Sequence, residues 1–412
     1  MSERIKNGDI NMLLKKILSV ITAISIAAGL CSCNALTSKN ETSATETTVE
    51  TTATNTEGTK ETTKETTAET TTMSTTATEA TTESTTESTT ESTTETTTEN
   101  TTTTETTAEK TEAHIAHRYA TAEEGLSLML ANDAYYAGFT QNDIDFKMQM
   151  TGASMEDYLE FASKQVLDFS EKEKAYLDAR IAHMEETLNS NGYVLPPLEE
   201  IVFIKTTMLE EAGAGGYTHG TQIYLGEDVL SMFIDNAQIP FYQKYAEEIL
   251  WHELFHCLTR CNPDFRKAMY SLINFTVTGT DFQLPPSVLE YHISNPDVEH
   301  HDAYATFIIN GQEIDCFTDL VTTKHFAEAR SSFFSCNTTA LIPVDGTDTY
   351  YTPEQAENFD DVFGTNTGYV IDPEECMADN FALAMNYRMN GADNTGYPNP
   401  EIVEGIIDYM KG

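Results

Sequence analysis

The sequence predicts an α+β fold in which helices dominate. Helix-capping signals open segments within residues 120–191. Two short runs, Ile201–Thr206 and Thr221–Leu225, have the β-branched and aromatic composition of strands. Two later segments, beginning at Pro240 and Asp372, carry apolar residues at helical spacing. Helical and strand patterns thus occur in one chain without the regular alternation of a parallel α/β protein.

The first 33 residues have the form of a secretory signal. An apolar run of fourteen residues, Ile17–Leu30, follows several basic residues and is short for a membrane span. It ends Leu30-Cys31-Ser32-Cys33, which resembles a bacterial lipobox. Lipidation of Cys33 would anchor the chain to the outer face of the membrane, at the bacterial cell surface. Cys31 is a weaker acceptor, and an ordinary cleaved signal is the alternative.

Residues 34–112 are predicted to form a disordered stalk. They are almost wholly Thr, Glu, Ser and Ala, so they cannot bury enough surface to offset the entropy of ordering. Residues 41–112 contain sixteen Glu and three Lys, a net charge of −13. Self-repulsion should keep this segment extended, as a spacer between a cell surface and a folded domain.

The folded part is predicted to begin with a mostly helical stretch, residues 113–200. Thr121–Glu124 and Ser170–Glu173 are capping-box signals within it. Residues 201–412 form the domain that carries the chemical motifs, with an insertion at about residues 263–363. The expected elements of this domain are two strands, two motif helices and a last helix, at Ile201–Thr206, Thr221–Leu225, Pro240–Thr259, Asp372–Ala384 and Glu401–Met410.

The helix expected from Pro240 carries the sequence H-E-x-x-H at residues 252–256. Positions four apart share one helix face, so His252 and His256 can reach the same metal ion. Glu253 between them can reach a water on that ion. The pattern fixes only three positions, so a chance match on an amphipathic helix is the alternative.

The third ligand is expected on the helix that begins at Asp372. Glu375 and Asp379 lie four residues apart on one face of it. Glu374 is another candidate ligand, and Glu375 could instead complete a capping box with Asp372. We favour Glu375, because only it has an acidic residue one turn further on.

The two motifs together resemble those of gluzincin metallopeptidases, and the second is similar to that of the catalytic domain of anthrax lethal factor and its relatives. The resemblance implies a zincin-like fold in which zinc is bound by His252, His256 and Glu375. Glu253 would be the general base, and Asp379 would orient a histidine ligand. Tyr369, six residues before Glu375, would donate to the oxyanion. The resemblance also implies a peptide substrate paired with the edge of a sheet. The strand Thr221–Leu225, just before the motif helix, would be that edge. The alternative, which the sequence alone favours, is an ordinary strand of the sheet.

Net charge limits the partner classes of the folded part, and its cysteines and other histidines have separate expected roles. Removing the stalk and the first forty residues from the total of −43 leaves about −33 on the folded part, which argues against nucleic acid and anionic lipid as partners. Five cysteines remain there, and Cys316 could pair with Cys336. We expect four histidines, His219, His292, His300 and His301, to have surface or cleft roles rather than metal ligation. His219 would touch substrate if it lies at the cleft end of its strand.

The sequence therefore predicts a surface-tethered zinc metalloendopeptidase that hydrolyses peptides or proteins. The alternative is a non-catalytic adhesin or binding module with a structural metal. Glu253 favours the enzyme, because a structural site has no need of a general base.

Overall fold

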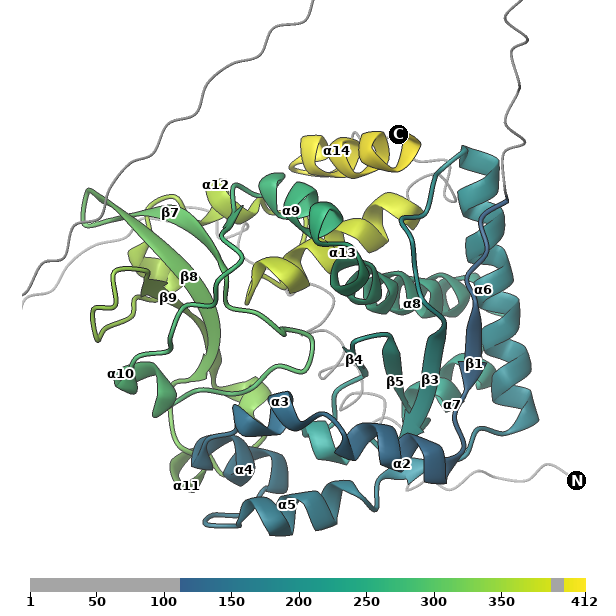
Figure 1. Cartoon of the computed structure of the whole chain (residues 1–412), viewed down its shortest axis with the longest axis horizontal. Helices are drawn as coiled ribbons and strands as arrows, with labels where there is room; N and C mark the ends of the chain where they lie inside the picture. Colours follow the sequence, from purple (N-terminus) through teal and green to yellow (C-terminus); the bar gives the residue numbers. More distant parts are fainter. Residues whose placement is uncertain (1–111, 387–395) are drawn as a thin grey trace, which may run out of the picture. The chain divides into compact units, whose positions relative to one another are not determined.

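The computed structural model describes residues 112–386 and 396–412. The predicted signal peptide with Cys33, and nearly all of the predicted stalk (34–112), lie outside the described residues. Within the described part of the chain, no helix is both long and apolar enough to cross a membrane. The α+β class is confirmed, with helices and two β-sheets in the unit shown in Figure 1.

The first β-sheet is mixed. Its strands, in spatial order, are β1 (His117–Tyr119), β3 (Ile201–Thr206), β5 (Gln222–Gly226) and β4 (Gly216–His219), with β2 (Val166–Leu167) also paired to β3. The strands β1, β3 and β5 run parallel, whereas β4 is antiparallel to β5 and β2 is antiparallel to β3. Every residue of β3 is buried, as expected for a central strand covered on both faces.

The second sheet is antiparallel and built from the insertion. Its strands are β6 (Thr276–Val277), β7 (Ala303–Ile309), β8 (Gln312–Thr322) and β9 (Asn337–Pro343), in that order. Asn310 and Gly311, between β7 and β8, both have positive φ, as a tight two-residue hairpin turn requires. Figure 1 shows this sheet on the opposite side of the unit from the mixed sheet.

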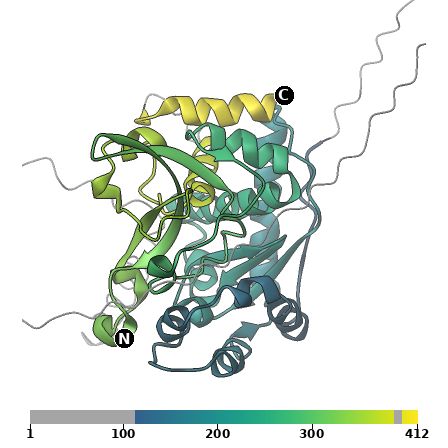
Figure 2. The ribbon, with the colours of Figure 1, turned by 60° about the vertical axis from the view of Figure 1, so that its left-hand side comes forward.

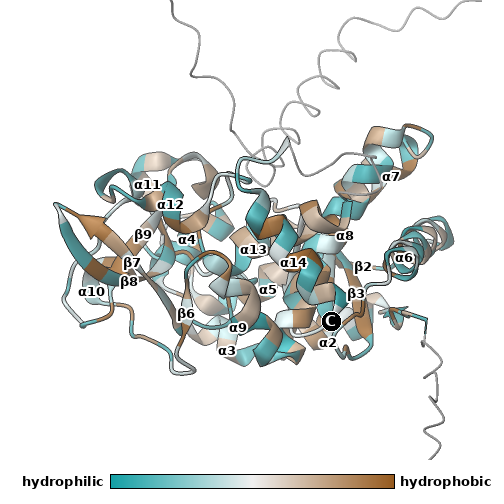
Figure 3. Cartoon of the chain, turned by 90° about the horizontal axis from the view of Figure 1, so that it is seen from above, coloured by the Kyte–Doolittle hydropathy of each residue, from teal (hydrophilic) through white to brown (hydrophobic). Residues whose placement is uncertain are grey.

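Six helices precede the motif segment in the described part of the chain. They are α2 (Ala122–Leu130), α3 (Asp133–Ala137), α4 (Gln141–Met148), α5 (Met155–Ala162), α6 (Glu171–Asn191) and α7 (Glu227–Asp235). Of the two predicted capping boxes, the one at Ser170 and Glu173 is complete, and at the other the Thr121 side chain accepts the N–H of Glu124. The helices α6 and α7 carry brown and teal residues side by side in Figure 3, as surface helices with one buried stripe should.

Two long helices cross the centre of the unit and pack against each other. They are α8 (Pro240–Cys261) and α13 (Pro373–Asn386). Shorter elements complete the fold, namely α9 (Pro263–Ser271), α10 (Pro286–Leu289), α11 (Phe326–Ala329), α12 (Phe359–Phe363) and α14 (Pro400–Lys411), with 3₁₀ turns at Leu209–Glu211, Phe333–Ser335 and Pro353–Gln355. In Figure 2, the yellow α14 lies at the opposite end of the unit from the blue helices near the N-terminal end of the described chain.

The largest hydrophobic core surrounds α8 and α13. Trp251 and Phe255 of α8 are fully buried, and their rings contact that of Phe381 on α13. Ala378 and Ala382 are also buried on α13, as expected for small residues that let a second helix approach closely. This packing fixes the distance between the two motif helices.

The segment Thr221–Leu225 forms an ordinary strand of the sheet, the reading that the sequence favoured, and not the edge strand. A strand does form there, as β5, but it lies inside the sheet between β3 and β4. The edge strand is β4, which was not among the expected elements. The chain turns only at Gly220, which has φ of 56°, so Tyr217 and Thr218 are free to pair with β5.

The Cys316–Cys336 pairing considered above does not form, since both cysteines are free. Cys316 on β8 pairs with Pro343, whereas Cys336 immediately precedes Asn337, which pairs with the far end of β8. Six residues of strand span about 20 Å. The two Cα atoms are therefore much further apart than the roughly 7 Å that a disulfide can bridge.

Candidate metal centre

Helix α8 presents both histidines of the motif to one side. It begins at Pro240 and is capped by Asn262, close to the predicted bounds. His252 and His256 lie one turn apart on the same face, with ring centroids separated by 4.8 Å. The His256 side chain is completely buried, while that of His252 keeps 15% of its surface exposed. Solvent can thus reach this face of the helix at His252.

Helix α13 brings Glu375 against the two histidines. The carboxylate of Asp372 accepts the N–H of Glu374 at 2.8 Å and starts the helix as predicted. Glu375 Oε2 lies 3.1 Å from His252 Nε2 and 3.6 Å from His256 Nε2. Zinc ligands with bonds of about 2.0–2.1 Å in tetrahedral geometry are about 3.3 Å apart. The three residues therefore have the spacing of a metal centre.

A carboxylate contacts the other ring nitrogen of each histidine. Asp379 Oδ1 lies 2.9 Å from His252 Nδ1, and Glu374 Oε1 lies 2.9 Å from His256 Nδ1. Such carboxylates can hold the proton on each Nδ1, so that a deprotonated Nε2 of each imidazole would be the atom that binds a metal ion. Glu374, considered above as a possible ligand, therefore lies behind His256 rather than among the converging ligand atoms.

The second oxygen of Glu375 is held by neutral donors. Asn295 Nδ2 donates to Glu375 Oε1 at 2.5 Å, and the Tyr369 hydroxyl donates to the same atom at 3.1 Å. The carboxylate thus faces the histidines and does not close a capping box with Asp372. Tyr369, which the resemblance places near the oxyanion, contacts this carboxylate in the structure.

Glu253 is buried between the motif helix and the edge strand. Its Oε2 accepts a hydrogen bond of 2.7 Å from the Thr218 hydroxyl. A Cβ atom at Gly216 would lie only 2.8 Å from Glu253 Oε1. Glycine at that position of β4 therefore allows the carboxylate to lie against the strand backbone.

The donor atoms fit a divalent metal. The buried Nε2 of His256 has no hydrogen-bond partner within the described residues, although buried polar atoms are rarely left unpaired. Two imidazoles and one carboxylate are a common protein donor set for catalytic zinc. A bound ion would satisfy this nitrogen.

Burial and neighbouring charges shift the pKa values of the acidic groups of the site in different directions. Burial alone would raise the pKa of Glu375, but the hydrogen bond from His252, the charges of His256 and His252 and the hydrogen bond from Asn295 together lower it to about 2. Burial raises the pKa of Glu253, opposed by the nearby histidines. Burial and the charge of Glu253 raise the pKa of Asp297 well above its ordinary value. Glu375 is therefore the carboxylate best kept ionised for ligation, and Glu253 is better suited than an exposed Glu to accept and return a proton.

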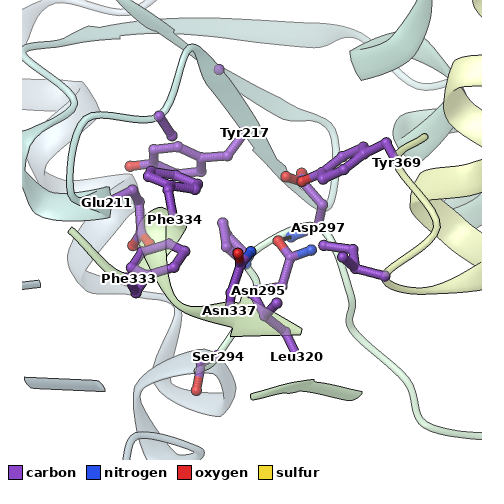
Figure 4. A pocket seen from close by; sticks show the side chains of 14 residues that line it. Glu211, Tyr217, Ser294, Asn295, Asp297, Leu320, Phe333, Phe334, Asn337 and Tyr369 are labelled. Atoms are coloured by element: carbon purple, nitrogen blue, oxygen red, sulfur yellow. Dashed lines mark hydrogen bonds between the residues drawn. The ribbon is translucent and has the colours of Figure 1, made fainter. Parts of the chain in front are cut away.

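Two residues at the site were missed by the sequence analysis because they belong to the insertion. Asp297 Oδ1 lies 3.9 Å from His256 Nε2, and Asn295 contacts Glu375. Asn295, Asp297 and Tyr369 gather on one side of a cavity of about 60 Å³, seen in Figure 4. No local motif marks either insertion residue, since only the tertiary fold brings them to the helices.

The other histidines of interest lie away from this centre, and none joins a metal-binding group among the described residues. His219 ends β4, its ring lies tilted at 4.7 Å from the ring of Tyr135, and it lines a cavity of about 650 Å³. His292 and His301 both contact Asp319, and His300 is exposed.

Comparisons of the chain with protein families, curated proteins and solved structures found no match.

Proposed function

We propose that the chain is a gluzincin-like zinc metalloendopeptidase. The observation that carries this proposal is the position of Glu375 Oε2, which lies 3.1 Å from His252 Nε2 and 3.6 Å from His256 Nε2, beside a buried Glu253. A mixed sheet with an antiparallel edge strand next to the motif helix is consistent with a zincin-like fold.

Each residue of the centre has a separate part in the proposed reaction. When bound, zinc would lower the pKa of a water molecule and polarise the scissile carbonyl. Glu253 would accept the proton of the attacking water and return it to the leaving amine. Asp379 and Glu374 would keep the imidazoles oriented, and Asn295 would keep Glu375 in place.

The substrate would lie along β4. A peptide pairing with this edge strand would pass Glu253, whose carboxylate packs against Gly216 and Thr218. Tyr369 is close enough to the centre to donate to an oxyanion, provided that its hydroxyl turns from Glu375. A peptide or protein is therefore the proposed substrate class.

Metal analysis and a cleavage assay test this function together. Purified protein containing residues 113–412 should hold about one zinc per chain, and His252→Ala or His256→Ala should abolish binding. The zinc-loaded protein should cleave members of a mixed peptide library read by mass spectrometry. Stoichiometric zinc in both histidine variants would refute the site.

The second candidate is a non-catalytic adhesin or binding module with a structural metal. The observation that favours it is Asp297, whose carboxylate lies near His256 and could close the metal site. Zinc-loaded protein that cleaves no peptide, even when Asp297 is replaced by Ala, would support this alternative.

We also propose that the enzyme is lipid-anchored at a bacterial surface through Cys33. The support is the lipobox-like sequence Leu30–Cys33 and the acidic Thr/Glu-rich segment that follows it. The anchor would be the chain's contact with the membrane, since its net charge of −43 disfavours adsorption to anionic lipid.

A further inference from the structure

The segment His292–His301 of the insertion lies across the metal centre, and one side chain of the second sheet contacts both of its ends. His292 Nδ1 lies 2.7 Å from Asp319 Oδ2, and His301 Nε2 lies 3.1 Å from Asp319 Oδ1. One buried carboxylate on β8 therefore holds both ends. Ile293 also donates its N–H to the carbonyl of Leu320 at 2.9 Å, which fixes the start of the segment to the sheet.

The middle of this segment contacts the proposed metal ligands and the proposed general base. Asn295 donates to Glu375, and Asp297 lies with Glu253 and His256 in a second group of closely spaced ligand atoms. Asp297 is buried, so its carboxylate is held among these residues rather than in solvent.

Side chains of the same segment, together with Arg260 of α8, occupy the free edge of β4 at Thr218. In an antiparallel pair, alternate residues direct their N–H and C=O groups away from the partner strand. Thr218 does so, but its N–H donates to Asp297 Oδ1 at 2.6 Å and its carbonyl accepts from Arg260 Nη2 at 3.3 Å. The N–H of Gly220 donates to Glu299 at 2.9 Å.

Arg260 ties the segment to the motif helix. It lies four residues after His256 on α8, and its Nη2 also donates to the carbonyl of Asp297 at 3.0 Å. Its Nε lies 2.7 Å from the carboxylate of Glu299. A peptide that pairs with β4 at Thr218 would have to displace these groups, because each main-chain donor and acceptor there is already used.

We propose that His292–His301 is an intramolecular strap that occupies the substrate edge of β4 and covers the metal centre. The strap therefore lowers the activity of the folded enzyme without abolishing it, because substrate or another ligand gains the site only in molecules whose strap is displaced. This inference rests on the proposed metallopeptidase function and describes the regulation of the same site.

The test compares the zinc-loaded full chain with two variants. Asp319→Asn loosens both ends of the strap, and Asp297→Ala removes the carboxylate in the middle of the strap. Asp315→Asn is the control, since Asp315 lies on the same strand but is exposed and contacts Thr306. We measure the rate at which a chelating dye withdraws zinc and the affinity for a peptide hydroxamate. Both strap variants should release zinc at least tenfold faster and bind the hydroxamate at least tenfold more tightly, with the control unchanged.

Amide hydrogen exchange gives a readout that does not depend on zinc. The Thr218 amide should exchange slowly in the wild type and faster in either strap variant, because its acceptor is Asp297. Circular dichroism establishes that each variant is folded, and Asp297→Ala tests the strap even if Asp319→Asn does not fold.

The outcomes separate the two proposals. Unchanged zinc release, hydroxamate affinity and Thr218 exchange in a folded Asp297→Ala variant would overturn the strap while leaving the metallopeptidase intact. A wild-type chain that binds no zinc would overturn the proposed function, and the strap with it.

Discussion

At the residue scale, adjacent side chains perform different tasks because a helix turns by about 100° per residue. Glu375 faces the position shared by both histidines, while neighbouring Glu374 contacts the far nitrogen of His256. Glu374 also accepts hydrogen bonds from Thr259 and Tyr270, so its burial is compensated. The register of α13 thus separates a ligand from the group that orients a ligand.

The paired acids give the first prediction. Glu375→Ala should reduce zinc affinity sharply and lower the melting temperature of the zinc-loaded protein, because ligand loss also removes folding free energy. Glu374→Ala should cost less, about 10–100-fold in affinity, since it removes an orienting partner. Competition with a zinc-binding dye measures both constants. A larger loss in Glu374→Ala would exchange the two roles.

Glu253 gives the second prediction. Glu253→Gln keeps the shape of the side chain but cannot accept a proton from water. Zinc should remain bound, and kcat for peptide hydrolysis should fall by roughly 10²–10⁴-fold. Glu248→Gln is the matched control on the same helix, where Glu248 pairs with Lys244 instead. Cleavage that persists in Glu253→Gln would have to come from another site or a contaminant.

At the scale of elements, the edge strand and the motif helix are fitted to each other. The strand β4 packs against α8, where Thr218 donates to Glu253 and Gly216 leaves room for its carboxylate. The turn at Gly220 sets the register of β4 on β5 and so fixes which residue of the strand meets Glu253. A slip of one residue would turn Thr218 to the other face of the sheet.

Gly216 gives the third prediction. In Gly216→Ala, the new methyl group would lie 2.8 Å from Glu253 Oε1 and 3.3 Å from the Tyr224 carbonyl, so the carboxylate must shift. We expect kcat to fall at least tenfold while zinc stays bound. Gly215→Ala is the control, because its nearest neighbour would be at 3.9 Å. Equal activity in the two variants would show that the position of Glu253 tolerates the shift.

The contact between His292 and β8 gives the fourth prediction. Burial opposes the charged form of His292, but the charge of Asp319 raises its pKa to about 9. Burial likewise opposes ionisation of Asp319, but the charge of His292 lowers its pKa to about 2. The contribution of His292 to stability is complete below its unfolded pKa of about 6.5 and is lost as the pH rises through 9. That of Asp319 is present above about pH 4 and is lost as the pH falls through 2.

The free energy of unfolding should therefore decrease between about pH 6.5 and 9, by on the order of 3 kcal/mol from this pair. In Asp319→Asn, this part of the pH dependence should disappear. Urea denaturation at several pH values measures the difference between the two proteins. Parallel pH profiles for wild type and variant would contradict the assignment to this pair.

At the scale of the whole molecule, the insertion contributes residues to the site. Its strands form the second sheet, and its segment His292–His301 reaches Glu375 and the edge strand. The strands β1 and β2, from the stretch predicted as helical, join the mixed sheet beside β3. Residues from most of the folded unit thus converge on the two motif helices.

The anchor gives the fifth prediction. In a bacterial host, the full chain should enter the membrane fraction and incorporate a labelled fatty acid, whereas Cys33→Ser should do neither. Cys31→Ser is the matched control and should behave as the wild type. Labelling that is lost only in Cys31→Ser would move the lipidation site, and a wild-type chain released without label would favour an ordinary cleaved signal.

The sequence alone determined the features that depend on local spacing. Four-residue spacing places His252 beside His256 and Glu375 beside Asp379 on any helix, and Pro240 and Asp372 mark where those helices begin. The α+β class follows in the same way from helical and strand patterns that each lie within a few residues.

Only the tertiary structure decided what depends on pairing between distant segments. Whether β4 or β5 is the edge strand, and which of Glu374 and Glu375 faces the histidines, follow from sheet order and helix packing. The placement of Asp297 over the site depends on a fold that closes a loop of the insertion through Asp319. A single sequence carries no local signal for such contacts, because their free energy comes from burial and charge that exist only when the chain is folded.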